Sequence, residues 1–233
     1  MVQIGDSSEA VMPAAPVQLW WTDRPGRGVL HETTFTLSGT RRSVWVYEPP
    51  GLTARNRPVV VVLDGRTWAA DLPIAGSVDA LARTGHRVPL VVMVASVGPE
   101  LRSEELGCSA AFASGLAGEL LPWLRREWGA TDDSASTIVA GCSLSGSFWW
   151  PGSGPGVPFQ HRVRVAAPSN SRFSVEVGTL EWMLVEPNRE VRDLLVGTGH
   201  DVRYREFCGG HDVLHWRDGL IAGVASMLER TDR

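Results

Sequence analysis

Three residues in the second half of the chain have the types and the order that nucleophilic catalysis by a serine requires. Ser143 lies in the sequence GCSLSG, directly after the apolar run TIVA, where a strand would end in a tight turn. Glu181 and His211 follow two later strand-like runs. A serine hydroxyl becomes a nucleophile when a histidine takes its proton and an acid orients that histidine. We therefore expect Ser143 as nucleophile, His211 as general base and Glu181 as the orienting acid.

The turn around Ser143 carries the small residues that a sharp strand-to-helix turn needs. Such a turn brings the backbone close to the following helix, so the residues beside the nucleophile must be small. Gly141 and Ser145 occupy these positions, and Gly146 follows. A serine on this kind of turn, then an acid, then a histidine is the chain order of α/β-hydrolases.

Each of the three residues also has an alternative interpretation. Ser143 could be an ordinary turn serine, and His211 could be a turn histidine that is hydrogen-bonded to Asp212. The acid could be a neighbouring glutamate instead of Glu181, and two are available, Glu176 and Glu186.

Acyl chemistry at a serine also needs backbone N–H groups that stabilise the negative oxygen of the tetrahedral intermediate. The turn supplies one donor, the N–H of Leu144. The loop DGRT, which follows the apolar run 58–63, supplies the second donor from Arg66. We expect these two groups to form the oxyanion hole.

Composition restricts the class of protein. The 233 residues are 43% hydrophobic and 21% charged, as in soluble globular proteins, and the net charge of −4 gives no bias toward nucleic acid. No apolar stretch approaches the roughly 20 residues that a membrane span needs, and no leader pattern opens the chain, so a cytoplasmic location is expected. The cysteines and histidines lack ligand spacing, so we expect neither a metal nor a cofactor.

Apolar patterning predicts one α/β domain over residues 1–233, with a mostly parallel sheet flanked by helices. Residues 1–28 are predicted to be a partly flexible N-terminal arm. Two antiparallel strands are expected within 31–49. Further strands are predicted at 58–63, 89–96, 137–140, 173–177 and 202–207, and helices at 72–84, 111–128, 187–198 and 214–230.

The segment after Ser143 is too short for an ordinary hydrolase. Residues 151–158 read PGSGPGVP and cannot be helical, so only eight residues, or about two turns, are available to the helix of the turn. Ser143 and Glu181 are 38 positions apart, too few for two strand–helix crossovers. The sequence therefore predicts a shortened helix and the loss of one strand at this point.

A series of motifs makes the chain resemble one family. In order, they are LDGRTW (63–68), RSEEL (102–106), ELLPW (119–123), IVAGCS (138–143), SGSFWW (145–150), EVGTLE (176–181), and GGHD (209–212) with WR (216–217). Together they resemble the enterochelin (enterobactin) esterases, α/β-hydrolases that open the trilactone backbone of catecholate siderophores. In that family a helix and a strand separate the turn from the SGSFWW segment, whereas here the two motifs are fused.

The resemblance implies a serine esterase that acts on an ester or lactone, such as a catecholate siderophore, and in this family a serine–histidine pair can work without an acid. Two other functions remain open: an acyl-transferring or cyclising enzyme of natural-product biosynthesis, and a binding protein of the same fold with impaired catalysis. We expect no nucleic-acid or membrane partner. Loss of a strand would leave an open sheet edge, which predicts a homodimer.

Other residues of these motifs could bind the substrate. Arg102 could hold a catecholate or carboxylate group, or it could pair with Glu105 as an ordinary surface charge. Four tryptophans could form an aromatic wall for planar rings: Trp68, Trp149, Trp150 and Trp216.

Overall fold

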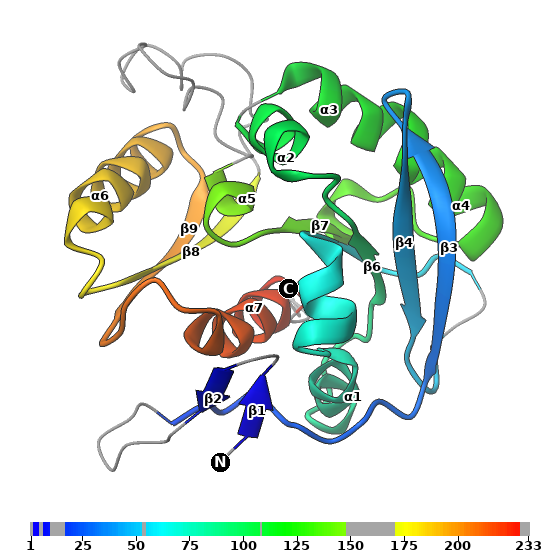
Figure 1. The fold of residues 1–233 in the computed structure, drawn as a ribbon, viewed down its shortest axis with the longest axis horizontal. Helices are drawn as coiled ribbons and strands as arrows, with labels where there is room; N and C mark the ends of the chain where they lie inside the picture. Colours follow the sequence, from blue (N-terminus) through cyan, green and yellow to red (C-terminus); the bar gives the residue numbers. More distant parts are fainter. Residues whose placement is uncertain are drawn as a thin grey trace.

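The computed structural model describes residues 2–4, 7–9, 17–52, 55–107, 109–147 and 171–228. Its centre is a mixed five-stranded sheet flanked by helices (Figure 1). The strand order is β3-β4-β6-β5-β7, with bounds β3 Val29–Leu37, β4 Thr40–Glu48, β5 Val59–Leu63, β6 Leu90–Val94 and β7 Thr137–Ala140. The first two strands form the predicted antiparallel hairpin, while β5 runs parallel to both β6 and β7.

Strand β5 reads VVVVL and β6 reads LVVMV, and every residue of both strands is buried. Such continuous apolar runs occur where helices cover both faces of a sheet. Val61 and its neighbours on one face pack against the helical segments between residues 99 and 128. Val60 and Val62 on the other face pack against two helices, α1 (Ala75–Arg83) and α7 (Val213–Leu228).

The helix expected over 111–128 is divided in the structure. It consists of α3 (Ala110–Gly115), a π-helical turn η2 (Leu116–Leu120) and α4 (Leu121–Trp128). Pro122 lies in the first turn of α4, just after the π turn, and its lack of an N–H interrupts regular bonding. The remaining helical segments near the sheet are η1 (Thr67–Asp71), α2 (Pro99–Leu106), η3 (Ser134–Ser136) and α5 (Leu144–Ser147).

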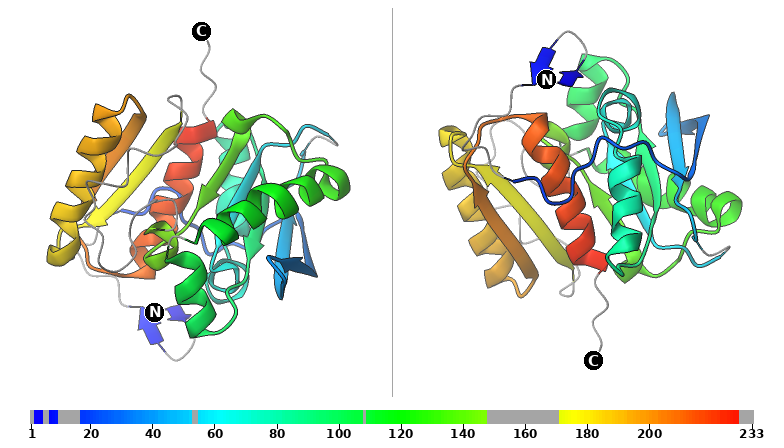
Figure 2. Two further views of the ribbon diagram at one scale, coloured as in Figure 1. Left: turned by 90° about the horizontal axis from the view of Figure 1, so that it is seen from above. Right: turned by 90° about the horizontal axis from the view of Figure 1, so that it is seen from below.

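The C-terminal part forms a second, two-stranded parallel sheet of β8 (Arg172–Gly178) and β9 (Asp201–Phe207). Helix α6 (Trp182–Gly197) packs against both strands, and α7 contacts β7 as well as β8 (Figures 1 and 2). Within the described residues no hydrogen bonds join β7 to β8. Residues 148–170 lie outside the described part of the chain, so the shortened crossover after Ser143 stays a prediction.

One predicted helix boundary is wrong. The helix expected at 187–198 begins five residues earlier, at Trp182, and Pro187 lies inside it. Proline removes a single N–H bond to the preceding turn, and the rest of this 16-residue helix continues past it.

Residues 17–28 of the expected arm are hydrogen-bonded to the body of the protein and cross α7 and α1 (Figure 2, right). The backbone N–H groups of Trp20 and Trp21 donate to the carboxylate of Asp218, at 2.6 and 3.0 Å. The guanidinium of Arg217 lies 4.5 Å from the ring centre of Trp21. This segment therefore holds α7, the helix that directly follows the His211 loop. Two short paired strands precede it, β1 (Val2–Ile4) and β2 (Ser7–Glu9).

None of the helices that the structure describes is long and apolar enough to cross a membrane.

We expect Asp218→Ala to lower the free energy of unfolding by about 1–3 kcal/mol, because it leaves two backbone N–H groups without their acceptor. Urea unfolding measures this loss, and limited proteolysis should show faster cleavage within residues 17–28. Asp218→Asn retains an acceptor oxygen, so its free energy of unfolding should fall by less than that of Asp218→Ala. Unchanged stability together with an equally resistant arm would contradict the anchoring role of Asp218.

Candidate active site

Ser143 lies on a sharp turn between β7 and α5. Its φ of 58° is in the left-handed region, which is uncommon for a residue other than glycine. Gly141 is needed because a Cβ at that position would lie 2.4 Å from the carbonyl oxygen of Ser145. The buried Ser145 hydroxyl accepts a hydrogen bond from the N–H of Cys142 at 2.9 Å and lies 2.7 Å from the carbonyl oxygen of the same residue. The side chain of Ser145 thus fastens the turn that presents Ser143.

The structure brings the three predicted residues together. Ser143 Oγ lies 2.8 Å from His211 Nε2, and His211 Nδ1 lies 2.5 Å from Glu181 Oε2. The second oxygen of Glu181 accepts the N–H of Gly178 at 2.8 Å. The Glu181 side chain is only 6% exposed, whereas that of His211 is 47% exposed. A carboxylate held in this way favours the tautomer in which Nδ1 carries hydrogen and Nε2 can accept the serine proton.

The alternative partners considered for these residues are engaged elsewhere. Glu176 accepts a hydrogen bond from Arg205 at 2.8 Å, and Glu186 accepts one from Arg189 at 2.7 Å. Asp212 accepts the N–H of Leu214 at the start of α7. Glu181 is therefore the acid that contacts the histidine.

The loops that carry Glu181 and His211 are joined through their backbones. Thr179 N–H donates to the carbonyl of Phe207 at 2.8 Å, and Leu180 N–H donates to the carbonyl of Gly209 at 2.9 Å. A Cβ on Gly178 would lie 2.3 Å from the Gly209 oxygen, so this close approach requires glycine. The acid and the histidine are positioned as one unit at the ends of β8 and β9.

The loop predicted to supply the second oxyanion donor follows β5, the parallel neighbour of β7. The carboxyl ends of these strands lie at the same edge of the sheet, so the Arg66 backbone and the Ser143 turn come from adjacent positions. Thr67 N–H closes the loop onto the carbonyl of Asp64 at 3.0 Å. The Arg66 side chain is 79% exposed, so the expected role of Arg66 concerns its backbone alone.

Arg102 does not pair with Glu105. Its guanidinium donates two hydrogen bonds to Asp64, both of 2.7 Å, while Glu105 pairs with the buried Arg42. Burial raises the pKa of Asp64, but the hydrogen bonds from Arg102, Ser96 and Ser145 outweigh burial and hold the pKa below its usual value. Asp64 is thus a carboxylate at neutral pH, and the Nε–Nη2 edge of the Arg102 guanidinium is already engaged.

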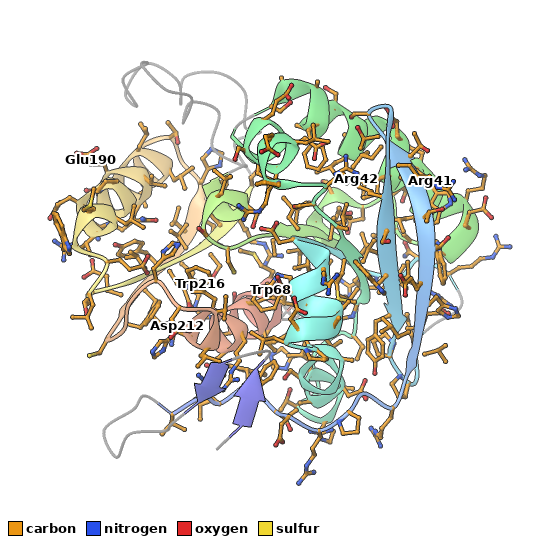
Figure 3. The ribbon with its side chains drawn as sticks, viewed as in Figure 1. Arg41, Arg42, Trp68, Glu190, Asp212 and Trp216 are labelled. Carbon is orange, nitrogen blue, oxygen red and sulfur yellow. The ribbon has the colours of Figure 1, made fainter. Side chains whose placement is uncertain are left out.

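The described residues do not assemble the predicted aromatic wall. Trp68 is 2% exposed and packs in the core beside α1 and α7. Trp216, labelled in Figure 3, lies on α7. Its ring is at 84° to that of His211, with the ring centres 4.5 Å apart. The Trp216 ring therefore packs edge-to-face with the imidazole of His211. Trp149 and Trp150 lie outside the described residues.

Cys142, the neighbour of Ser143, is not a competing nucleophile. Burial, together with the negative charges of Asp64 and Glu176, raises the pKa of its thiol to about 12. The thiolate is the reactive form of cysteine, so this side chain is inert at neutral pH.

Comparisons with known proteins find similarity to esterases. Residues 36–149 match the family model described as "Putative esterase". The chain is 31% identical to an iron(III) enterobactin esterase of Dickeya dadantii over 273 aligned positions, which cover 97% of this chain and 62% of that protein. Because that alignment is longer than the 233-residue chain, the relative carries segments that this chain lacks. An Escherichia coli K12 iron(III) enterobactin esterase is 28% identical, with 94% and 62% covered.

Solved structures show the same relationship. The enterobactin esterase of Shigella flexneri superposes with a TM-score of 0.82 at 26% identity, over 93% of this chain and 63% of that chain. A ferulic acid esterase shares the fold with a TM-score of 0.70 at 16% identity, over 86% of this chain and 97% of that chain. The chain thus spans less than two thirds of the enterobactin esterases that it matches. Over most of its length the chain is thus similar to the enterobactin esterases, and it shares the α/β fold of these enzymes and of the ferulic acid esterase.

Proposed function

We propose that the protein is a serine esterase that hydrolyses a siderophore-like lactone or a related aryl-amide ester through acylation of Ser143. One observation carries this proposal: Ser143, on a strained turn, lies 2.8 Å from the imidazole of His211. That distance falls within the range of about 2.6–3.2 Å over which a base can take the serine proton. The names of the similar proteins support the ester substrate, because the Dickeya dadantii and Escherichia coli relatives described above are both named iron(III) enterobactin esterases.

In the proposed reaction, Ser143 Oγ attacks the carbonyl carbon of the ester while His211 Nε2 takes the hydroxyl proton. The negative oxygen of the tetrahedral intermediate accepts hydrogen bonds from the N–H groups of Leu144 and Arg66. His211 then gives its proton to the leaving alkoxide, and the C–O bond breaks to leave an acyl-enzyme. Water, deprotonated by the same histidine, releases the acid and regenerates Ser143.

Glu181 would stabilise the imidazolium that forms in both halves of the reaction. Its carboxylate is nearly buried and is bonded to His211 Nδ1, so its charge acts on the ring with little screening by water. The partly exposed face of His211 gives water a route to the acyl-enzyme.

The two alternatives, acyl transfer and simple binding, differ from hydrolysis in their products. A transferase would pass the acyl group from Ser143 to an added amine or alcohol, whereas a hydrolase releases the acid whether or not an acceptor is present. A binding protein of this fold would form no acyl-enzyme. Product analysis with and without an acceptor separates these functions.

Assembly and location also remain proposals. Within the described residues the outer edge of β7 pairs with no strand, and all four residues of β7 are partly exposed. An open edge of this kind favours association, so we propose a homodimer. We also propose the cytoplasmic location that the sequence led us to expect. Light scattering at high micromolar concentration should give twice the mass of 25.3 kDa, and a monomer under those conditions would contradict the dimer.

We expect a fluorophosphonate probe to label the wild type at Ser143, because the probe reacts with serines that an adjacent base activates. Intact-mass and peptide mass spectrometry measure the adduct and its position. Ser143→Ala is the matched control and should remain unlabelled. If the wild type is not labelled and hydrolyses no activated ester, the esterase proposal fails and a binding function takes its place.

Ser143→Ala and His211→Ala should each lower kcat by roughly 10⁴- to 10⁶-fold, and the double variant should lose little more, because the two residues act as one unit. Glu181→Gln should lower kcat by less than either alanine substitution, since it leaves the serine–histidine contact in place. Steady-state hydrolysis of an activated aryl ester measures these losses. Additive losses would show that the two residues act independently, against the proposed mechanism.

A further inference from the structure

The carboxylate of Asp64 joins segments that surround the proposed reacting centre. Asp64 directly follows β5 and opens the segment that carries Arg66. It accepts two hydrogen bonds of 2.7 Å from Arg102 on α2, and a third of 2.7 Å from the hydroxyl of Ser96, which follows β6. The loop after β5 is thereby tied to a helix and to a second strand end.

The same carboxylate reaches the nucleophile turn. The hydroxyl of Ser145 lies beside Asp64 and, when it donates there, favours the ionised carboxylate. This hydroxyl also fastens the turn through Cys142, and its single hydrogen can go either to the Cys142 carbonyl or to Asp64. Helices α2 and α5, which carry Arg102 and Ser145, are in contact (Figure 1). One ionised group therefore spans the two loops that are expected to form the oxyanion hole.

The backbone of Asp64 is strained, with φ at 56°. A left-handed conformation is unfavourable for a residue with a Cβ, and it persists when the surrounding structure enforces it. The ion pair with Arg102 and the hydrogen bond from the Ser96 hydroxyl hold Asp64 in this conformation. Loss of the pair would let the peptide groups after Asp64 rotate, including the N–H of Arg66.

We propose that Asp64 and Arg102 are positioning residues, which set the direction of the Arg66 N–H relative to the Leu144 N–H in the oxyanion hole. This inference rests on the proposed esterase function, because it concerns the negative oxygen formed on acylation. It assigns Arg102 a different role from the anionic-substrate contact that its sequence suggested.

The two roles of Arg102 lead to different kinetics. If Arg102 binds an anionic group, its loss raises KM for an anionic ester and leaves a neutral ester unaffected. If it positions the oxyanion loop, its loss lowers kcat for both esters alike and changes KM little. Asp64→Asn separates the roles further, because it releases Arg102 for an anionic substrate but loosens the loop.

The experiment compares 4-nitrophenyl butyrate with 3-carboxy-4-nitrophenyl butyrate, which adds a carboxylate to the same ester. We expect Arg102→Gln and Asp64→Asn to lower kcat about 10- to 100-fold for both substrates, since a misdirected donor loses part of the oxyanion stabilisation. The kcat of Arg102→Lys should lie between those of the wild type and Arg102→Gln, because an ammonium keeps the charge but not the bidentate geometry.

Glu105→Gln is the matched control. Glu105 is on the same helix as Arg102 and forms a bidentate pair of its own, with Arg42 and not with Asp64. We expect this variant to lower the melting temperature while kcat stays within about threefold of the wild type, because it disturbs packing without touching the oxyanion loop. Melting temperatures of all the variants establish that each is folded at the assay temperature.

Three results would overturn the inference. The first is an increase in KM of Arg102→Gln that is confined to the anionic ester. The second is an unchanged kcat in a folded Arg102→Gln variant. The third is a loss of kcat in Glu105→Gln equal to that in Arg102→Gln. An active wild type with any of these results leaves the esterase proposal intact. A wild type that neither hydrolyses the esters nor is labelled at Ser143 removes both proposals together.

Discussion

The candidate site depends on the left-handed turn at Ser143. A residue with a Cβ holds that conformation only when its neighbours enforce it, and here Gly141 permits the close approach while Ser145 binds the Cys142 backbone. The turn raises the hydroxyl above the end of β7. Because β5 lies parallel to β7, the loop after β5 opens at the same edge. The Asp64 carboxylate then links that loop to α2 and to the turn.

The base and the acid reach this edge from a separate structural unit. They follow β8 and β9, which pair with each other and, among the described residues, not with β7. The bond between Ser143 and His211 therefore crosses between two sheets. Helix α7 contacts both β7 and β8, and residues 17–28 are bonded across it. The geometry at the histidine thus depends on a helix that the N-terminal segment holds in place.

Sequence patterns predicted the elements where local information is strong. The apolar runs of β5 and β6 and the alternating hairpin of β3 and β4 were assigned correctly, because burial on one face or both leaves a direct periodic signal. The start of α6 was misplaced at Pro187, since proline resembles a helix boundary even where the packing of a long helix overrides it. The partner of Arg102 was also missed. Asp64 is 38 positions away in sequence, and no spacing rule connects an arginine on α2 to the end of β5.

The sequence by itself pointed to the serine and the histidine and to the chain order serine, acid, histidine, because a tight turn and a glycine-rich loop leave recognisable local residues. It also determined the resemblance to the enterobactin esterases. Only the tertiary structure decided which glutamate meets the histidine, which carboxylate holds Arg102, and which tryptophan packs against the imidazole. These choices are contacts between distant segments. They depend on strand order and helix packing in three dimensions, which local residue patterns do not encode.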